Sequence, residues 1–169
     1  EEWISYRNRL ETSARIGAEE YGLTVGIHAH AAGFMDFEPE LERLLSEVDD
    51  NILKICFDTG HHSYAGFDPV KFVQKYISRI SYVHFKDVNP EIKQKVIENR
   101  TGFYDACGQG IFCNLGDGDV DFPTVRKILI ESEFKGWCTV EQDCDPLLDP
   151  NPLSDAQVNR EYLETIGFS

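Results

Sequence analysis

Imidazoles and carboxylates lie at or near the ends of several apolar runs in this sequence. Asp58 ends one run, His84 lies near the end of a second, Glu141 ends a third, and an earlier run contains His28 and His30. Imidazole nitrogens and carboxylate oxygens together form a ligand set that suits Mn²⁺, Zn²⁺, Co²⁺, Fe²⁺ or Mg²⁺. The sequence therefore predicts a divalent-metal site, provided that the fold brings the ends of these runs together.

His61 and Lys86 are predicted to lie close to this site. His61 follows Asp58 by three residues in an expected loop, so it could be a metal ligand, a proton carrier or a substrate contact. Lys86 has the same strand parity as His84, so it would point inward and could hold a ketone or carboxylate oxygen, with a solvated lysine as the alternative. The predicted catalytic residues are Glu141, His61 and Lys86, and the predicted substrate contacts are His30, His61 and Lys86.

Strands and helices alternate along the chain. Apolar runs with strand-like residues predict strands at 23–28, 52–58, 80–86 and 136–142. Helical spacing of apolar residues, with Asp-Pro, Glu-Pro or Phe-Pro at several starts, predicts helices at 1–21, 38–48, 68–77, 122–130 and 155–166. This order indicates a parallel sheet whose polar strand ends meet at one edge, where barrels of this kind carry their active sites.

Four strand-helix units are half of a (β/α)8 barrel, which takes about 250 residues. The predicted fold class is therefore α/β, with residues 1–169 forming the C-terminal half of a TIM barrel as one partial domain. An open four-stranded sheet would expose an edge and its inner face. We therefore expect a fragment, inactive alone, or completion by a second chain such as another copy. The start at Glu1 without a methionine favours the fragment.

Residues 88–120 form a long connection between the third strand and the next helix. They contain a helical pattern at 90–99, the aromatic pair Phe103-Tyr104 and the stretch Gly116-Asp117-Gly118-Asp119, and we expect an otherwise irregular segment. Long connections inside compact domains are usually functional. The segment is therefore predicted to be a lid or a partner-contact loop above the strand ends.

The composition disfavours some classes of partner and favours one compartment. The net charge of −14 disfavours binding to nucleic acid, because basic residues supply most of that affinity. The five cysteines are odd in number and show no Cys-x-x-Cys spacing, which favours reduced thiols in the cytoplasm. The sequence has no apolar run of about 18 residues, so no membrane span is expected.

Several motifs resemble those of a known superfamily. The segment 28–146 is similar to the C-terminal half of the xylose-isomerase-like barrels, which include sugar isomerases, epimerases and endonuclease IV. It resembles the inosose dehydratases of this superfamily more closely than the epimerases. The motifs that carry the resemblance are Asp58-Thr59-Gly60-His61, Phe67-Asp68-Pro69, Val83-His84-Phe85-Lys86-Asp87, Gly116-Asp117-Gly118-Asp119-Val120-Asp121-Phe122 and Val140-Glu141-Gln142-Asp143.

The resemblance implies a divalent metal held by Asp58, His84, Glu141 and one residue of the first strand. In the epimerases that fourth position is glutamate, whereas here it falls at His28. Either His28 or His30 could therefore be the fourth ligand.

The resemblance also implies a reaction on a polyhydroxy ketone. A bound metal would polarise the ketone, so that a general base could remove the neighbouring proton and form an enediolate. Loss of the β-hydroxyl would be dehydration, and 2-keto-myo-inositol is the expected substrate. Reprotonation would instead give a ketose isomerase or epimerase, and loss of catalysis would leave a sugar-binding barrel. A DNA-repair role is disfavoured by the charge of −14.

Overall fold

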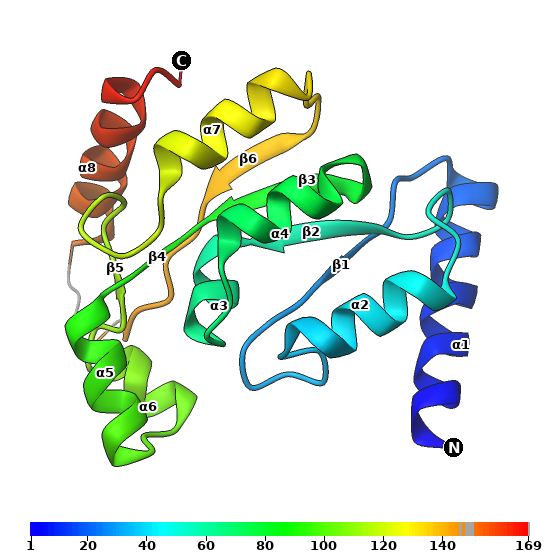
Figure 1. The fold of residues 1–169 in the computed structure, drawn as a ribbon, viewed down its shortest axis with the longest axis horizontal. Coiled ribbons are helices and arrows are strands. Elements are labelled where there is room, and N and C mark those ends of the chain that lie inside the picture. The colour runs from blue at the N-terminus through cyan, green and yellow to red at the C-terminus, as the bar shows by residue number, and fades with distance from the viewer. Residues whose placement is uncertain (146, 148–150, 169) are drawn as a thin grey trace.

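The computed structural model describes residues 1–145, 147 and 151–168. Its centre is a parallel sheet with the strand order β1-β2-β3-β6 (Figure 1). The predicted α/β class with a parallel sheet is therefore confirmed. The strands are β1 (Gly26–His28), β2 (Lys54–Asp58), β3 (Ile80–Phe85) and β6 (Trp137–Val140).

All four strands are shorter than predicted, and for β2 and β6 the structure shows what lies at the shortened end. Before β2, the backbone N–H groups of Ile52 and Leu53 both donate to the carbonyl of Asp49, which forms a turn where the strand was expected to begin. After β6, the Glu141 N–H still donates to the Phe85 carbonyl at 3.0 Å, so Glu141 continues the line of the strand. Its side chain is thereby fixed at the carboxyl edge of the sheet.

The predicted helices are present. Asp68 begins one of them by accepting hydrogen bonds from the backbone N–H groups of Val70 and Lys71, and Asp121 accepts one from Thr124 in the same way. The last helix begins at Pro152, three residues before the predicted start. These helices are α1 (Glu2–Arg15), which continues into a π-helical turn (Ile16–Glu20), α2 (Glu38–Glu47), α4 (Pro69–Tyr76), which continues into a 3₁₀ turn (Ile77–Arg79), α7 (Phe122–Glu131) and α8 (Pro152–Thr165).

Two helices were not predicted, α6 (Phe103–Gly108) in the 88–120 connection and one directly after β2. Residues expected to form a loop after β2 form α3 (Thr59–Tyr64). Its start is fixed by Asp58, whose Oδ1 accepts a hydrogen bond of 2.8 Å from the His61 N–H. The helix places His61 and His62 on different sides of the chain.

The two faces of the sheet differ, because successive side chains of β2 point to opposite sides. Ile55 and Phe57 are buried against the helices, and Phe57 stacks on Phe72 of α4 with ring centroids 4.9 Å apart. Cys56 and Asp58 point to the opposite face. Because this second face carries the predicted site residues, the helices position the strands without covering the site.

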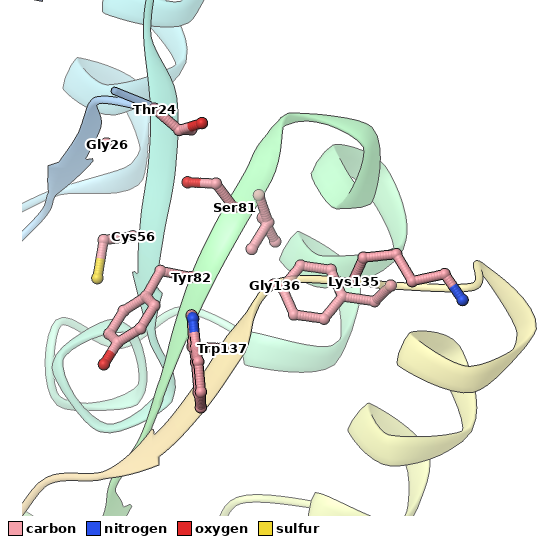
Figure 2. A pocket seen from close by; sticks show the side chains of 10 residues that line it. Thr24, Gly26, Cys56, Ser81, Tyr82, Lys135, Gly136 and Trp137 are labelled. Atoms are coloured by element: carbon pink, nitrogen blue, oxygen red, sulfur yellow. The ribbon is translucent and has the colours of Figure 1, made fainter. Parts of the chain in front are cut away.

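The second face is open near the beginnings of the strands. A hollow of about 630 Å³ lies there, and Figure 2 shows Cys56, Tyr82 and Trp137 among the residues that line it. Trp137 has 76% of its surface exposed. In a closed barrel such positions are filled by layers of side chains from all the strands. The hollow therefore lies where barrel-core packing would be expected, away from the carboxyl edge.

The connection at 88–120 has more regular structure than expected. It contains β4 (Asp87–Val88), α5 (Pro90–Asn99), α6 (Phe103–Gly108) and β5 (Phe112–Cys113), and β4 pairs with β5 in an antiparallel ribbon (Figure 1). The expectation of an irregular segment is therefore wrong. Its side chains form a separate small core of Val88, Val96, Ala106, Ile111 and Phe112.

Asp87 fixes the glycine-rich end of this connection. Its buried carboxylate accepts hydrogen bonds from the backbone N–H groups of Val88, Gly116, Gly118 and Val120, at 2.9 to 3.1 Å. A Cβ on Gly118 would collide with Asp87 Oδ1, so a glycine is needed at this close approach. The loop is thus held against the residue that follows Lys86.

None of the helices that the structure describes is long and apolar enough to cross a membrane.

Candidate metal centre

Four predicted site residues meet at the carboxyl edge of the sheet, three from within β1, β2 and β3 and one directly after β6. His28, Asp58, His84 and Glu141 offer ligand atoms that all lie within 4.8 Å of one another. The strand register explains the meeting, because Asp58 is the direct partner of His84 and Glu141 follows the pair of Phe85 with Val140. The parallel sheet therefore brings together residues that are far apart in the sequence.

Several atoms of this cluster are buried without hydrogen-bond partners. They are His28 Nε2, Asp58 Oδ2 and His84 Nδ1. His84 Nδ1 lies 2.5 Å from Glu141 Oε2, yet their relative orientation does not make a hydrogen bond. Because an unpartnered buried polar atom costs about 1–3 kcal/mol, such a group needs an explanation. A divalent ion between these nitrogen and oxygen atoms would satisfy them, so the donor set fits a metal.

Asp58 is ionised at the centre of the cluster. Burial opposes its charge, but the imidazoles of His28 and His84 and the ammonium of Lys86 outweigh burial and hold the pKa of Asp58 far below its usual range. The two imidazole nitrogens lie 3.6 and 3.5 Å from Oδ2, a range in which the interaction is electrostatic. Since Oδ1 caps α3, only Oδ2 is directed at the cluster.

The two ring nitrogens of His84 face different groups. Its Nδ1 faces Asp58 and Glu141, whereas its Nε2 lies 3.5 Å from the sulfur of Cys56. Asp58 raises the pKa of His84 and Glu141 adds to this effect, against the opposite effect of burial. A metal ion would compete with the proton for Nδ1.

Lys86 is buried, so the alternative of a solvated lysine is wrong. Its side chain has 0% exposure, and its Nζ lies 2.8 Å from Glu141 Oε1, 2.9 Å from Asp143 Oδ2 and 3.4 Å from Asp58 Oδ2. Burial alone would lower the pKa of Lys86, but these carboxylates raise it. The stem of Lys86 packs so closely on α3 that a Cβ at Gly60 would lie 2.5 Å from Lys86 Cγ. Lys86 is therefore a permanently charged group inside the site.

His61 lies beside Lys86 and is kept neutral. Its Nε2 accepts a hydrogen bond of 2.9 Å from the Lys86 ammonium. Burial lowers the pKa of His61 to about 3, with Lys86 acting in the same direction. The insertion contributes the rings of Phe103 and Phe112, which lie 5.8 and 5.5 Å from the His61 ring between centroids. Residues 88–120 thus form an apolar wall on one side of the site.

His30 joins this side of the site, and His62 does not. The rings of His30 and His61 have centroids 3.8 Å apart. His62 turns away and pairs with Glu38 of α2, with His62 Nε2 3.0 Å from Glu38 Oε2. Of the two neighbouring histidines His61 and His62, only His61 reaches the cluster.

Two residues at the site were not predicted from the sequence. Asp143 carries the carboxylate that pairs with Lys86, and it has the same parity as Glu141, a signal that could have revealed it. Cys56 was not assigned to the site, although its parity with Asp58 places it on the site face. Cys56 contacts the predicted ligand His84, and Asp143 contacts Lys86.

Comparison with known proteins agrees with this architecture. Residues 1–166 match the family described as Xylose isomerase-like TIM barrel. The chain is 36% identical over 164 residues to an inosose dehydratase of Clostridium botulinum (strain Alaska E43 / Type E3). The aligned region covers 97% of this chain and 54% of that protein. An inosose dehydratase of Geobacillus kaustophilus (strain HTA426) is 34% identical over 165 residues, with 98% and 53% covered. The chain thus spans about half the length of these relatives.

Solved structures share the fold. The probable 3-DHS dehydratase AsbF of Bacillus anthracis superposes with a TM-score of 0.72 at 22% identity, covering 94% of this chain and 55% of that one. The IOLI protein, whose crystal structure has a bound zinc atom, superposes with a TM-score of 0.70 at 18% identity, covering 99% and 58%. From the family match over residues 1–166, we conclude that the chain belongs to the xylose isomerase-like TIM barrel family and corresponds to about half of such a barrel.

Proposed function

We propose that this chain supplies the metal-binding and acid-base half of a carbohydrate lyase that dehydrates 2-keto-myo-inositol. The observation that carries the proposal is the set of buried, unpartnered atoms on His28, Asp58 and His84, which converge with Glu141 at the carboxyl edge of the sheet. The identity of 34 to 36% to proteins named inosose dehydratase supports the choice of substrate. The activity belongs to the complete protein, because these relatives are about twice as long.

The proposed metal ligands are His28 Nε2, Asp58 Oδ2, His84 Nδ1 and a carboxylate oxygen of Glu141. When bound, a divalent ion would polarise the ketone and make the adjacent C–H bond more acidic. His28 is favoured over His30 as the first-strand ligand, because its Nε2 is unpartnered and faces Asp58. His30 Nδ1 donates to the Ala31 carbonyl at 2.7 Å, so its Nε2 is left as an acceptor for a substrate hydroxyl.

Glu141 is the proposed proton acceptor. Its side chain is 33% exposed, so it reaches the open face from which a substrate would arrive. Lys86 donates to Glu141 Oε1 at 2.8 Å and thereby fixes the position of that carboxylate. A proton removed next to the ketone would leave an enediolate, and departure of the β-hydroxyl with a proton, as water, would complete the dehydration.

Lys86 and His61 support this step from behind the carboxylates. Both side chains are buried, at 0% and 2% exposure. Lys86 therefore acts on the reaction through Glu141 and Asp143, and neutral His61 holds the ammonium in position. We therefore propose that both residues take part in acid-base chemistry indirectly, through the carboxylates. They would contact the substrate directly if substrate binding moved Glu141 and Asp143 aside.

The test is to incubate the complete, metal-loaded protein with 2-keto-myo-inositol and, separately, with free ketoses in deuterated water. A dione that absorbs in the ultraviolet is expected only with 2-keto-myo-inositol. Deuterium exchange into a ketose without loss of water would instead identify an epimerase. Absence of both signals, in protein shown to hold its metal, would overturn the catalytic proposal and leave a sugar-binding barrel.

A further inference from the structure

A second group of ligand-type side chains lies beside the candidate metal centre. His30, His61 and Asp143 offer ligand atoms within 4.8 Å of one another. Two imidazoles and a carboxylate also hold zinc in many proteins. The chemistry of this second group alone would therefore allow a second metal ion.

The ammonium of Lys86 already lies in the second group. Lys86 Nζ is 2.9 Å from His61 Nε2 and 2.9 Å from Asp143 Oδ2. A metal ion would bind the same two atoms at about 2.0–2.2 Å. The ion and the ammonium would then compete for one position and repel each other, so only one of them can be present.

The candidate metal centre and the second group also differ in whether their buried polar atoms have hydrogen-bond partners. The candidate metal centre has unpartnered buried atoms on His28, Asp58 and His84. Within the described part of the chain, no buried atom of the second group lacks a partner. The second group is thus satisfied by Lys86, whereas the first group still needs a ligand.

The balance of charges also indicates that Lys86 excludes a second divalent ion. The carboxylates of Asp58, Glu141 and Asp143 all lie within 3.4 Å of Lys86 Nζ. One ammonium together with one divalent ion would neutralise these three charges. With the ammonium present, a second divalent ion would leave two uncompensated positive charges in the buried site, whereas two divalent ions without the ammonium would leave one.

We propose that Lys86 is the permanent cation of the second group, and that removing its ammonium opens a second divalent-cation site formed by His30, His61 and Asp143. This inference deepens the proposed function, because it rests on the same cluster and sets the number of metal ions that the site holds. The expected ion is one that binds imidazole and carboxylate together, such as Zn²⁺ or Mn²⁺.

The experiment compares the complete wild-type protein with its Lys86→Ala variant. Both are freed of metal, equilibrated with excess Mn²⁺ or Zn²⁺, separated from unbound metal and analysed for bound metal per chain. Lys86→Ala is expected to hold one more ion per chain than the wild type. An equal count would overturn the proposal. The gain is the difference in bound metal between Lys86→Ala and the wild type. A wild type that binds no metal would refute the proposed function, and the difference between the two proteins would still test this proposal.

Two further variants keep the test decisive. Lys93→Ala removes another lysine that pairs with an aspartate, Asp119 at 3.2 Å, outside both groups, and is expected to leave the metal count unchanged. Asp143→Asn is expected to leave the wild-type count unchanged and to abolish the gain in Lys86→Ala. If Lys86→Ala does not fold, Lys86→Met replaces it in the same metal count, because methionine keeps a long apolar stem against Gly60 and removes the ammonium. Loss of an ion in Asp143→Asn alone would also overturn the proposal, since it would show that the second group already binds metal beside Lys86.

Discussion

The sulfur of Cys56 lies 3.5 Å from Nε2 of His84 on the neighbouring strand. The other nitrogen of the same ring, Nδ1, is directed at Asp58 and Glu141. Histidines that bind metal usually donate their second N–H to a neighbouring group, which fixes the tautomer and the ring orientation. Burial, together with Asp58 and Glu141, raises the pKa of Cys56 to about 12, so the partner of Nε2 is a neutral thiol.

Replacing Cys56 by alanine is therefore expected to weaken metal binding. Without the sulfur, His84 loses the contact that orients Nδ1, and we expect the metal affinity to fall by about tenfold. Cys56→Ser, which keeps an acceptor, is expected to retain most of the affinity. Calorimetric titration of metal-free protein with Zn²⁺ measures the change.

Cys138→Ala provides the matched control, because this cysteine lies in β6, which pairs with the strand of His84, and packs on the core side. The control is expected to keep wild-type affinity. If both alanine variants bound Zn²⁺ equally well, the orienting role of Cys56 would be wrong.

Asp58→Asn separates the two roles of Asp58. Asparagine keeps a side-chain oxygen to accept the 2.8 Å hydrogen bond from the His61 N–H, so α3 is expected to remain capped. It lacks the negative charge that faces His28 and His84. We expect metal content close to zero with unchanged helicity, measured by elemental analysis and circular dichroism. Unchanged metal content would contradict Asp58 as a ligand.

Asp87→Ala is expected to destabilise the fold without touching the metal cluster. The carboxylate accepts from four backbone N–H groups of β4 and the glycine-rich loop, and alanine would leave these donors unsatisfied. A loss of about 3 kcal/mol in the free energy of unfolding is expected. Urea unfolding, with the exposed Asp117→Ala as control, measures it. A loss no larger than that of the control would show that the loop does not depend on Asp87.

Residues on strands were the most predictable part of the site. Asp58, His84 and Glu141 could be placed together from the sequence, because parallel strands share one carboxyl edge and alternation fixes which side chains face inward. The fold class followed from the same alternation of strands and helices. These inferences need only local patterns and one rule of topology.

Features that depend on distant contacts could not be predicted. The burial of Lys86 results from Asp143 and Phe112, which lie in separate later segments, so no local pattern distinguishes it from a solvated lysine. The short helix α3 begins through the side chain of Asp58 itself, and its glycine and two histidines give no helical periodicity. The order of the 88–120 segment depends likewise on its own small core.

His62 is expected to make the free energy of unfolding depend on pH. Burial lowers the pKa of His62 to about 4, below the ordinary value of 6.5, although Asp68 acts in the opposite direction. Between these two values the unfolded chain binds more protons than the folded chain, so the stability contributed by neutral His62 is complete above pH 6.5 and is lost as the pH falls towards 4. The upper limit of this loss is about 3 kcal/mol.

The variant His62→Phe tests this dependence. Phenylalanine suits the site, because the His62 ring already lies 5.3, 5.5 and 4.6 Å from the rings of Phe57, Phe67 and Phe72. Burial raises the pKa of the partner Glu38, and its uptake of a proton opposes part of the effect. Urea unfolding at pH 7.5 and pH 5 is expected to show a larger loss of stability for the wild type than for His62→Phe. Equal losses would mean that His62 is already charged in the folded protein near pH 5, and that its pair with Glu38 is a salt bridge instead.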